Sequence, residues 1–417
     1  MTAEIAIINR SGIALAADSA LTIGRDRVWK NSNKLFHLSP ASDVGVMFYG
    51  SGDYCGLPWE VVLKEFRKKL GKSTKSNLKD YVEEFLIFLD DLTVPNTPLR
   101  ELQTLFLFMN AIAEVSDQLS AANAIKRREQ VISVANELER SAIELPILFE
   151  EYNIDDFKRS FEKKIRELMV DQLKMHITNG MVHAILKLCF ERTRRTFEST
   201  VETGVVFAGY GHQELLPVVM ELCVDGALEG KVRAWKIQEA NMNTGTTASG
   251  ILPFAQADIA KLFVEGTLPQ YVSYTERTLL LTLNRKSDEL VQAYVPDAEK
   301  VVERARQHQA NKIMVDTFAE KFKEYRHDES VKSLMRVVNS LPKEEMALLA
   351  EALVETTSLR RKMDSNLETV GGPVDVAIVS KSDGFIWIKR KHYFDISLNR
   401  DFIDRRNEKY QGGNNDA

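Results

Sequence analysis

Three side chains near the start of the chain are of the types that an amide-hydrolysing site needs. Thr2, Asp18 and Lys34 follow one another at intervals of sixteen positions. A threonine hydroxyl is a weak nucleophile, but the free α-amine of an N-terminal threonine can act as its base. A nearby ammonium group keeps that amine neutral at pH 7, and a carboxylate holds the ammonium in place. We therefore expect Thr2 to be a nucleophile once Met1 is removed, supported by Lys34 and Asp18.

Each of these residues also has an ordinary structural interpretation when taken alone. Asp18 then is a turn residue after a strand, and Lys34 is a solvated charge at a strand edge. Their joint spacing with Thr2 favours the functional interpretation. Lys34 precedes an apolar strand, and a lysine that is partly buried there needs a partner, for which Asp18 is the natural candidate.

A glycine-rich turn, YGSGDYCG at 49–56, follows the strand predicted at 44–50. A backbone N–H in such a turn can stabilise the oxyanion that forms when an amide is attacked. The glycines also permit a tight connection from a strand to a helix, which is their structural alternative.

The alternation of apolar residues and the turn signals predict the elements that must position these groups. In the first part of the chain we expect strands over 2–9, 13–17, 34–39 and 44–50 and helices over 57–71 and 76–92. Beyond the VPNTP break at 94–98, three amphipathic stretches at 98–122, 124–145 and 155–197 predict a helical hairpin or small bundle.

Strands return after residue 200. The pattern predicts strands over 204–211, 216–226 and 231–238, a loop leading into a helix over 246–266, helices over 274–292, 296–325, 329–341 and 342–363, and a β-hairpin over 373–391. Because strands and helices come in separate runs, the fold class is α+β, with sheets assembled from distant parts of the chain.

Composition excludes several classes of function. The chain has 417 residues and a formal net charge of -5, with acidic and basic residues mixed, which argues against a nucleic-acid-binding surface. Its three cysteines form no CxxC pair, so neither a zinc site nor a disulfide framework is indicated. No apolar run approaches the ~20 residues that span a bilayer. We expect a cytoplasmic protein that needs no cofactor or metal.

Four parts of the chain within residues 2–53 resemble the proteasome β-subunit family, including the bacterial HslV-type peptidases. They are Thr2, GIALAADSALTIG (12–24), NKLFHLS (33–39) and VGVMFYGSGD (44–53). Members of that family are N-terminal nucleophile hydrolases of the threonine type. The resemblance implies that the Gly50 N–H contributes to an oxyanion hole. It also matches Ser249 in ASG (248–250) to a serine that supports the active site, although an N-cap role for Ser249 is equally compatible with the sequence.

The resemblance implies an αββα four-layer sandwich of two antiparallel sheets with a large helical insertion. The expected organisation is an N-terminal half of this core over 1–96, the insertion over 97–200, a C-terminal half with extra helices over 201–392, and a tail over 393–417. The implied activity is hydrolysis of peptide bonds in a peptide or an unfolded protein. The implied assembly is a homo-oligomer, such as a ring, and the insertion could bind an unfoldase or adaptor.

The sequence departs from the family pattern in MDSNLETVGG (363–372), where Leu367 and Val370 stand at the places of an aspartate and a serine. The residues that could substitute for them are Asp364, Glu368 and Thr369. Two alternatives to a peptidase therefore stay open. One is an inactive scaffold on the same fold that acts through its helical insertion, and the other is an amidase that acts on a small amide.

Overall fold

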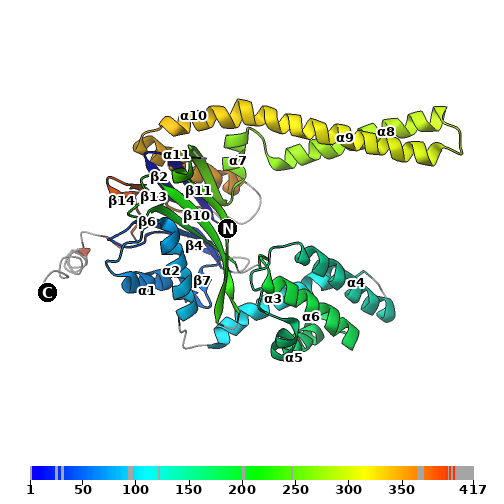
Figure 1. The fold of residues 1–417 in the computed structure, drawn as a ribbon, viewed down its shortest axis with the longest axis horizontal. Coiled ribbons are helices and arrows are strands. Elements are labelled where there is room, and N and C mark those ends of the chain that lie inside the picture. The colour runs from blue at the N-terminus through cyan, green and yellow to red at the C-terminus, as the bar shows by residue number, and fades with distance from the viewer. Residues whose placement is uncertain are drawn as a thin grey trace.

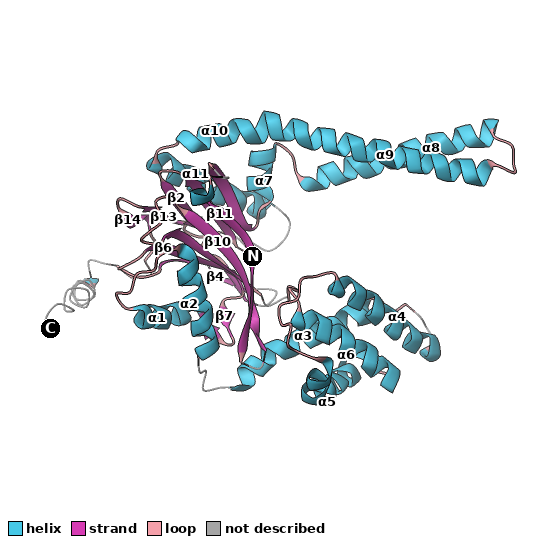
Figure 2. Cartoon of the chain, in the orientation of Figure 1, coloured by secondary structure: helices cyan, strands magenta, loops and turns pink. Residues whose placement is uncertain are grey.

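Two five-stranded antiparallel sheets form the centre of the molecule (Figures 1 and 2). The structure is a computed structural model that describes residues 2–23, 27–29, 32–92, 97–120, 123–199, 202–228, 230–245, 248–363, 371–392, 394–395 and 398–399. The first sheet has the order β12 (Ser249–Ala255), β1 (Ala3–Asn9), β2 (Gly12–Ala17), β13 (Asp375–Ser380) and β14 (Gly384–Lys389). The second has the order β11 (Lys231–Asn241), β10 (Val218–Leu228), β9 (Thr203–Tyr210), β6 (Asp43–Gly50) and β5 (Leu35–His37).

Strand β1 is buried on both faces, which explains why its sequence is mostly apolar rather than alternating, with Glu4 and Asn9 as its polar residues. Ala6 and Ile8 belong to a cluster that also contains Met47 and Val206 of the second sheet. Side chains alternate along a strand, so Ala3, Ile5 and Ile7 point to the opposite face. They pack in a cluster with the helix that covers the outer face of the first sheet.

Helices cover the outer faces of the two sheets (Figure 2). Helices α1 (Trp59–Leu70) and α2 (Leu78–Asp91) bury their apolar faces in one cluster with β6, β9 and β10. Helix α11 (Lys343–Met363) packs on β1 and β2, together with side chains of α7 (Asp258–Glu265) and α10 (Lys332–Ser340).

A helical bundle extends from one end of the second sheet. It consists of α3 (Thr97–Asp117), α4 (Ala124–Ile143), α5 (Ile154–Leu173) and α6 (Asn179–Arg194), which share a core cluster of their own. The sequence suggested one stretch over 155–197, but the chain breaks there. Lys174 adopts a left-handed conformation that ends α5, and the Thr178 hydroxyl accepts a hydrogen bond from the Met181 N–H at the start of α6.

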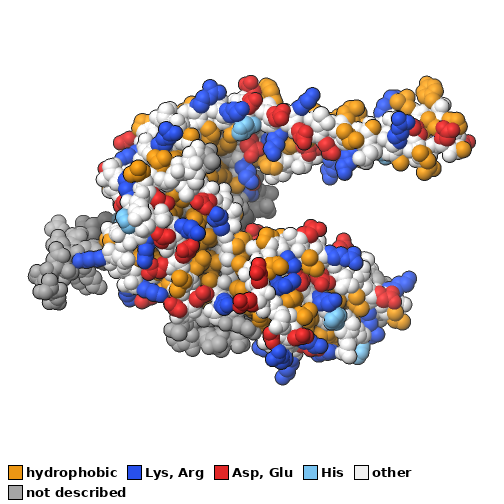
Figure 3. Space-filling view, viewed as in Figure 1, with side chains coloured by type: hydrophobic (Ala, Val, Ile, Leu, Met, Phe, Trp, Pro, Cys, Tyr) orange, Lys and Arg blue, Asp and Glu red, His pale blue; other side chains and the backbone are white. Residues whose placement is uncertain are grey.

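A long helical hairpin extends from the first sheet (Figure 1). It consists of α8 (Pro269–Tyr294) and α9 (Lys300–Arg326), and a short π-helix, His327–Val331, connects α9 to α10. Only Val291, Asn311 and Val315 are buried among its described residues. The bundle and the hairpin run in the same direction with open space between them (Figure 3).

The expectation of a loop before a helix over 246–266 was partly wrong, because a strand precedes the helix. Residues 249–255 form β12, which pairs with β1 from Ala3↔Ala255 to Asn9↔Ser249. Pro253 hid this strand from the sequence pattern, but β12 lies at a sheet edge, where a proline is tolerated.

Two short hairpins were also absent from the sequence interpretation. They are β3 (Leu21–Ile23) with β4 (Arg27–Trp29), and β7 (Asp53–Tyr54) with β8 (Leu57–Pro58). Most of the tail expected over 393–417 lies outside the described residues. Within the described part of the chain, no helix is long and apolar enough to cross a membrane.

Candidate active site

The β1–β2 hairpin brings Asp18 beside the start of β1. The Asp18 N–H donates to the Ala3 carbonyl at 3.0 Å, and the Ala3 N–H donates back to Asp18 Oδ1 at 3.1 Å. Lys34 arrives from the second sheet, where it directly precedes β5. Two sheets and three chain segments therefore meet at Thr2.

The Lys34 ammonium joins the other two side chains. Its Nζ lies 2.9 Å from Thr2 Oγ1 and 2.6 Å from Asp18 Oδ1, in hydrogen-bonding geometry with both. Thr2, Lys34 and Asp18 are 6%, 5% and 0% exposed. In such a water-poor place the ion pair is weakly screened, so the ammonium acts strongly on the threonine beside it.

Asp18 is further fixed by backbone donors from both sides. Its Oδ2 accepts from the Ala20 N–H at 3.3 Å and from the Gly371 N–H at 2.9 Å. The Ser19 N–H donates to the Gly371 carbonyl at 3.2 Å, and the Ser19 hydroxyl donates to the Pro373 carbonyl. The bonds to Oδ2 fix the carboxylate, and those of Ser19 fix the segment that carries it, so that Oδ1 stays oriented toward Lys34.

Gly371 is a support that sequence reasoning missed, although the glycine pair before β13 was a visible signal. Its φ is +147°, a conformation that favours glycine. The residues considered as substitutes for the missing aspartate and serine, Asp364, Glu368 and Thr369, lie outside the described residues, as do Leu367 and Val370.

Gly50 lies at the end of β6, beside Thr2, in a conformation that requires glycine. Its φ is +85°, and a Cβ at this position would come within 2.4 Å of the Glu202 carbonyl oxygen. The following turn is tied down by bonds from the Ser51 N–H to the Glu202 carbonyl and from the Trp59 N–H to the Gly52 carbonyl. The turn is therefore rigid where an oxyanion site would need fixed donors.

A pocket of about 240 Å³ opens directly on these groups. Its lining includes Thr2, Lys34 and Gly50, with Phe48 and Trp59 as the large apolar side chains. The rings of Phe48 and Trp59 stack with their centroids 5.0 Å apart. The pocket thus combines a nucleophile, a cation and an apolar wall.

The structure does not bring Ser249 to this pocket. Ser249 is paired with Asn9, at the opposite end of β1 from Thr2, and its hydroxyl donates to the Met335 carbonyl of α10 at 2.8 Å. It is also not a helix N-cap, because it begins strand β12. We therefore leave Ser249 out of the site that we propose below.

Sequence reasoning also missed a set of buried polar groups behind Thr2. Glu4 is fully buried on β1, and burial raises the pKa of its carboxyl well above the usual value. Burial likewise raises the pKa of Glu221 on β10, whose carboxylate accepts hydrogen bonds from Tyr49 and Gln238. The pKa of Tyr49 is raised by burial and by its bond to Glu221.

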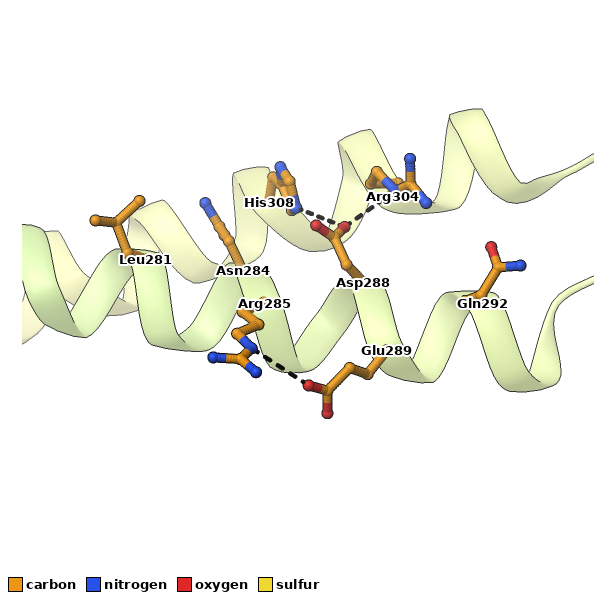
Figure 4. A pocket seen from close by; sticks show the side chains of 8 residues that line it. All are labelled: Leu281, Asn284, Arg285, Asp288, Glu289, Gln292, Arg304 and His308. Carbon is orange, nitrogen blue, oxygen red and sulfur yellow. Dashed lines mark hydrogen bonds and ion pairs between the residues drawn. The ribbon is translucent and has the colours of Figure 1, made fainter.

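A larger hollow of about 620 Å³ lies between α8 and α9 (Figure 4) and shares no lining residue with the Thr2 pocket. Its charged side chains pair with one another. Asp288 lies 2.9 Å from His308 and 3.0 Å from Arg304, and Arg285 lies 3.5 Å from Glu289. Among the described residues no group of three or more His, Cys, Asp or Glu side chains could hold a metal ion. The Thr2 pocket is thus the better candidate for chemistry.

No family model matches the chain, and no curated protein matches it. Solved structures that it resembles include Anbu proteins. The Gly-1 mutant of Anbu from Hyphomicrobium sp. strain MC1 is 12% identical with a TM-score of 0.30, covering 99% of this chain and 97% of that one. Anbu (ancestral beta-subunit) from Yersinia bercovieri is 10% identical with a TM-score of 0.30, covering 98% and 97%. The helical assembly of the Anbu complex from Pseudomonas aeruginosa is 9% identical with a TM-score of 0.32, covering 100% of this chain and 98% of that one.

These comparisons correct the family that the sequence suggested. The chain was expected to resemble the proteasome β-subunit family, including the HslV-type peptidases, and the solved structures above are Anbu proteins instead. Their identities and TM-scores are too low to carry an argument about function. The case for an activity therefore rests on the geometry around Thr2.

Proposed function

We propose that the chain is an N-terminal nucleophile hydrolase that cleaves peptide bonds through Thr2. One observation carries the proposal. Lys34 Nζ bridges Thr2 Oγ1 at 2.9 Å and Asp18 Oδ1 at 2.6 Å; all three side chains are buried, and Thr2 and Lys34 line a pocket. Burial of an ion pair costs desolvation free energy, and a buried ammonium beside a hydroxyl in a pocket is the kind of arrangement found at functional sites.

The proposed reaction begins with attack of Thr2 Oγ on the substrate carbonyl. The Thr2 α-amine accepts the hydroxyl proton, and Lys34 favours the neutral form of that amine because two cations side by side repel. The Gly50 N–H donates to the oxyanion. The amine then passes its proton to the leaving nitrogen, and water hydrolyses the ester on Thr2 to release the acyl group.

The pocket is compatible with a peptide substrate. Its volume of about 240 Å³ is below the roughly 300–1,000 Å³ of pockets that enclose whole small ligands. Such a space fits one large side chain of a longer substrate, and Phe48 and Trp59 line it. We further propose that the two sheets with their covering helices form the αββα sandwich of this class of hydrolase.

The proposal requires a free amine on Thr2, and mass spectrometry tests this directly. The intact mass is measured before and after treatment with a peptide epoxyketone, which reacts with both the amine and the hydroxyl of one N-terminal residue. We expect a protein without Met1 that gains one adduct. Thr2→Ser should still be labelled because it keeps both groups, whereas Thr2→Ala should not be labelled. A protein without Met1 that gains no adduct, as an inactive scaffold would, contradicts the proposal.

Assembly of the chain as a homo-oligomer stays a prediction. Large apolar side chains such as Tyr271, Leu281 and Val301 are exposed on the hairpin, and exposed apolar surface marks interaction sites. Native mass spectrometry measures the state directly. A monomer at working concentration would overturn this prediction without affecting the proposed chemistry.

A further inference from the structure

Glu4 is a fully buried carboxyl group that the proposed reaction does not use. Its exposure is 0%, and neither of its oxygens has a hydrogen-bond partner among the described residues. Glu221 makes a useful contrast, because its carboxylate is also buried but accepts bonds from Tyr49 and Gln238. A carboxylate without partners is very unfavourable in such a place, so Glu4 is held as the neutral acid.

The position of Glu4 on β1 places its side chain on the same side of the strand as Thr2, which Lys34 contacts. Side chains alternate along the strand, so Glu4 shares with Thr2 and Ala6 the face between the sheets. The charged or titratable groups facing it are Lys34 before β5 and Asp18 after β2, together with Tyr49 of β6 and Glu221 of β10. Of these four groups, only Lys34 is a cation.

The hydrogen bonds of Lys34 leave room for one more acceptor. An ammonium group has three N–H donors, and Lys34 is bonded to Thr2 Oγ1 and Asp18 Oδ1. An ionised Glu4 would be a second buried carboxylate attracted to the same cation. It would compete for Lys34 with the contact to Thr2, which is the weaker of the two because the hydroxyl is uncharged.

We propose that Glu4 is a positioning residue that must stay protonated for Lys34 to remain on Thr2. This inference rests on the proposed function. While Glu4 is neutral, the Lys34 ammonium donates hydrogen bonds to Asp18 and Thr2. When Glu4 loses its proton to solvent, the new carboxylate draws the ammonium away from the hydroxyl. The nucleophile then loses its electrostatic support, and its reactivity falls as the pH rises.

The pH dependence of epoxyketone labelling tests the role. Rates are compared for the wild type, Glu4→Gln and Glu4→Leu from about pH 5 to about pH 10, a range that spans the ordinary glutamate and lysine values. At the acid end all three should react within about threefold of one another. At the alkaline end the wild type should fall behind both variants, by about tenfold for each pH unit above the pKa of Glu4.

Glu214→Gln is the matched control. Glu214 is also a buried glutamate in the sheet region, but it accepts bonds from the Leu78 and Gly211 N–H groups, away from Thr2. Glu214→Gln should therefore show the same pH dependence of epoxyketone labelling as the wild type. Superimposable profiles for the wild type and both Glu4 variants would overturn the proposal, as would a loss of more than about tenfold for Glu4→Gln at the acid end.

Crystal structures at about pH 6 and about pH 9 give a second test that needs no activity. In the wild type the distance from Lys34 Nζ to Thr2 Oγ1 should lengthen at the higher pH, and in Glu4→Gln it should stay the same. An unchanged distance in the wild type contradicts the inference about Glu4. Absence of labelling in every variant, with the pH-dependent distance intact, would instead contradict the proposed hydrolase and leave the pairing of Glu4 with Lys34 supported.

Discussion

The helical bundle α3–α6 and the helical hairpin α8–α9 both extend from the sheets, but they are stabilised in different ways. The bundle has a continuous apolar core that includes the fully buried Phe108 and Phe157. The hairpin buries only Val291, Asn311 and Val315 among its described residues, and it exposes aromatic side chains such as Tyr294. Four helices can enclose side chains between them, whereas two helices leave most of their surface in water.

The two regions also differ in how they join the sheets. Arg233 of β11 is 1% exposed and links the bundle to the second sheet. Its guanidinium donates to Asp225 Oδ2 at 2.6 Å and to the carbonyls of Thr193 at 2.9 Å and Arg195 at 3.1 Å. The hairpin is joined at its base by a partly exposed ion pair, in which Arg326 lies 3.0 Å from Glu265.

The largest expected effect is on the bundle core. Phe157→Ala should destabilise the bundle by about 3–5 kcal/mol, because it leaves a cavity among the rings of Phe108, Phe161 and Phe190. Val315→Ala in the hairpin should cost about 1–2 kcal/mol. Hydrogen exchange of the amides in α5 and α9 measures both. Equal losses of protection would contradict the distinction between the two regions.

An effect of similar size is expected at the junction with the bundle. Arg233→Met should cost about 3–5 kcal/mol, since it leaves the buried Asp225 carboxylate without its cation. Protection from hydrogen exchange should fall over 193–199, while the interior of α5 stays protected. Arg304→Met is the control, because the pair of Arg304 with Asp288 is exposed and worth about 1 kcal/mol or less. Equal losses of stability for Arg233→Met and Arg304→Met would show that Arg233 does not hold the bundle to the second sheet.

The smallest effect is expected for removal of the hairpin. Its two ends are close together, because a Cβ on Gly266 would lie 3.2 Å from the Ser330 hydroxyl oxygen. Replacing residues 269–326 by a short flexible linker should therefore change the stability of the sheets by about 1 kcal/mol or less. Thermal unfolding and epoxyketone labelling of the shortened chain measure this. Loss of the folded sheets would mean that the hairpin is part of their core.

The sequence predicted well what depends on residues close together in the chain. The strands over 2–50 follow from short apolar segments bounded by turn signals, and the grouping of Thr2, Asp18 and Lys34 was suggested by their fixed spacing. The structure brings these three side chains together with Gly50, and their catalytic roles stay predictions. The fold class was predicted as far as two antiparallel sheets assembled from distant segments.

Features that depend on distant segments could not be predicted. Ser249 was matched to the site through a short motif, yet pairing with Asn9 places it at the other end of β1. Glu4 looked like an ordinary polar residue in a strand, because nothing near it in sequence shows that the second sheet covers it. Arg233 was likewise one charge among several until the carbonyls at the end of α6 surrounded it.

The far end of strand β1 is bonded to the base of the hairpin. The Asn9 side chain donates to the carbonyls of Val338 and Leu341, each at 2.9 Å, at the end of α10. Helix α10 continues from α9 through the π-helix, so the segment bonded to β1 is directly continuous with the hairpin. The other end of that strand carries Thr2. A single extended backbone thus connects the base of the hairpin to the nucleophile.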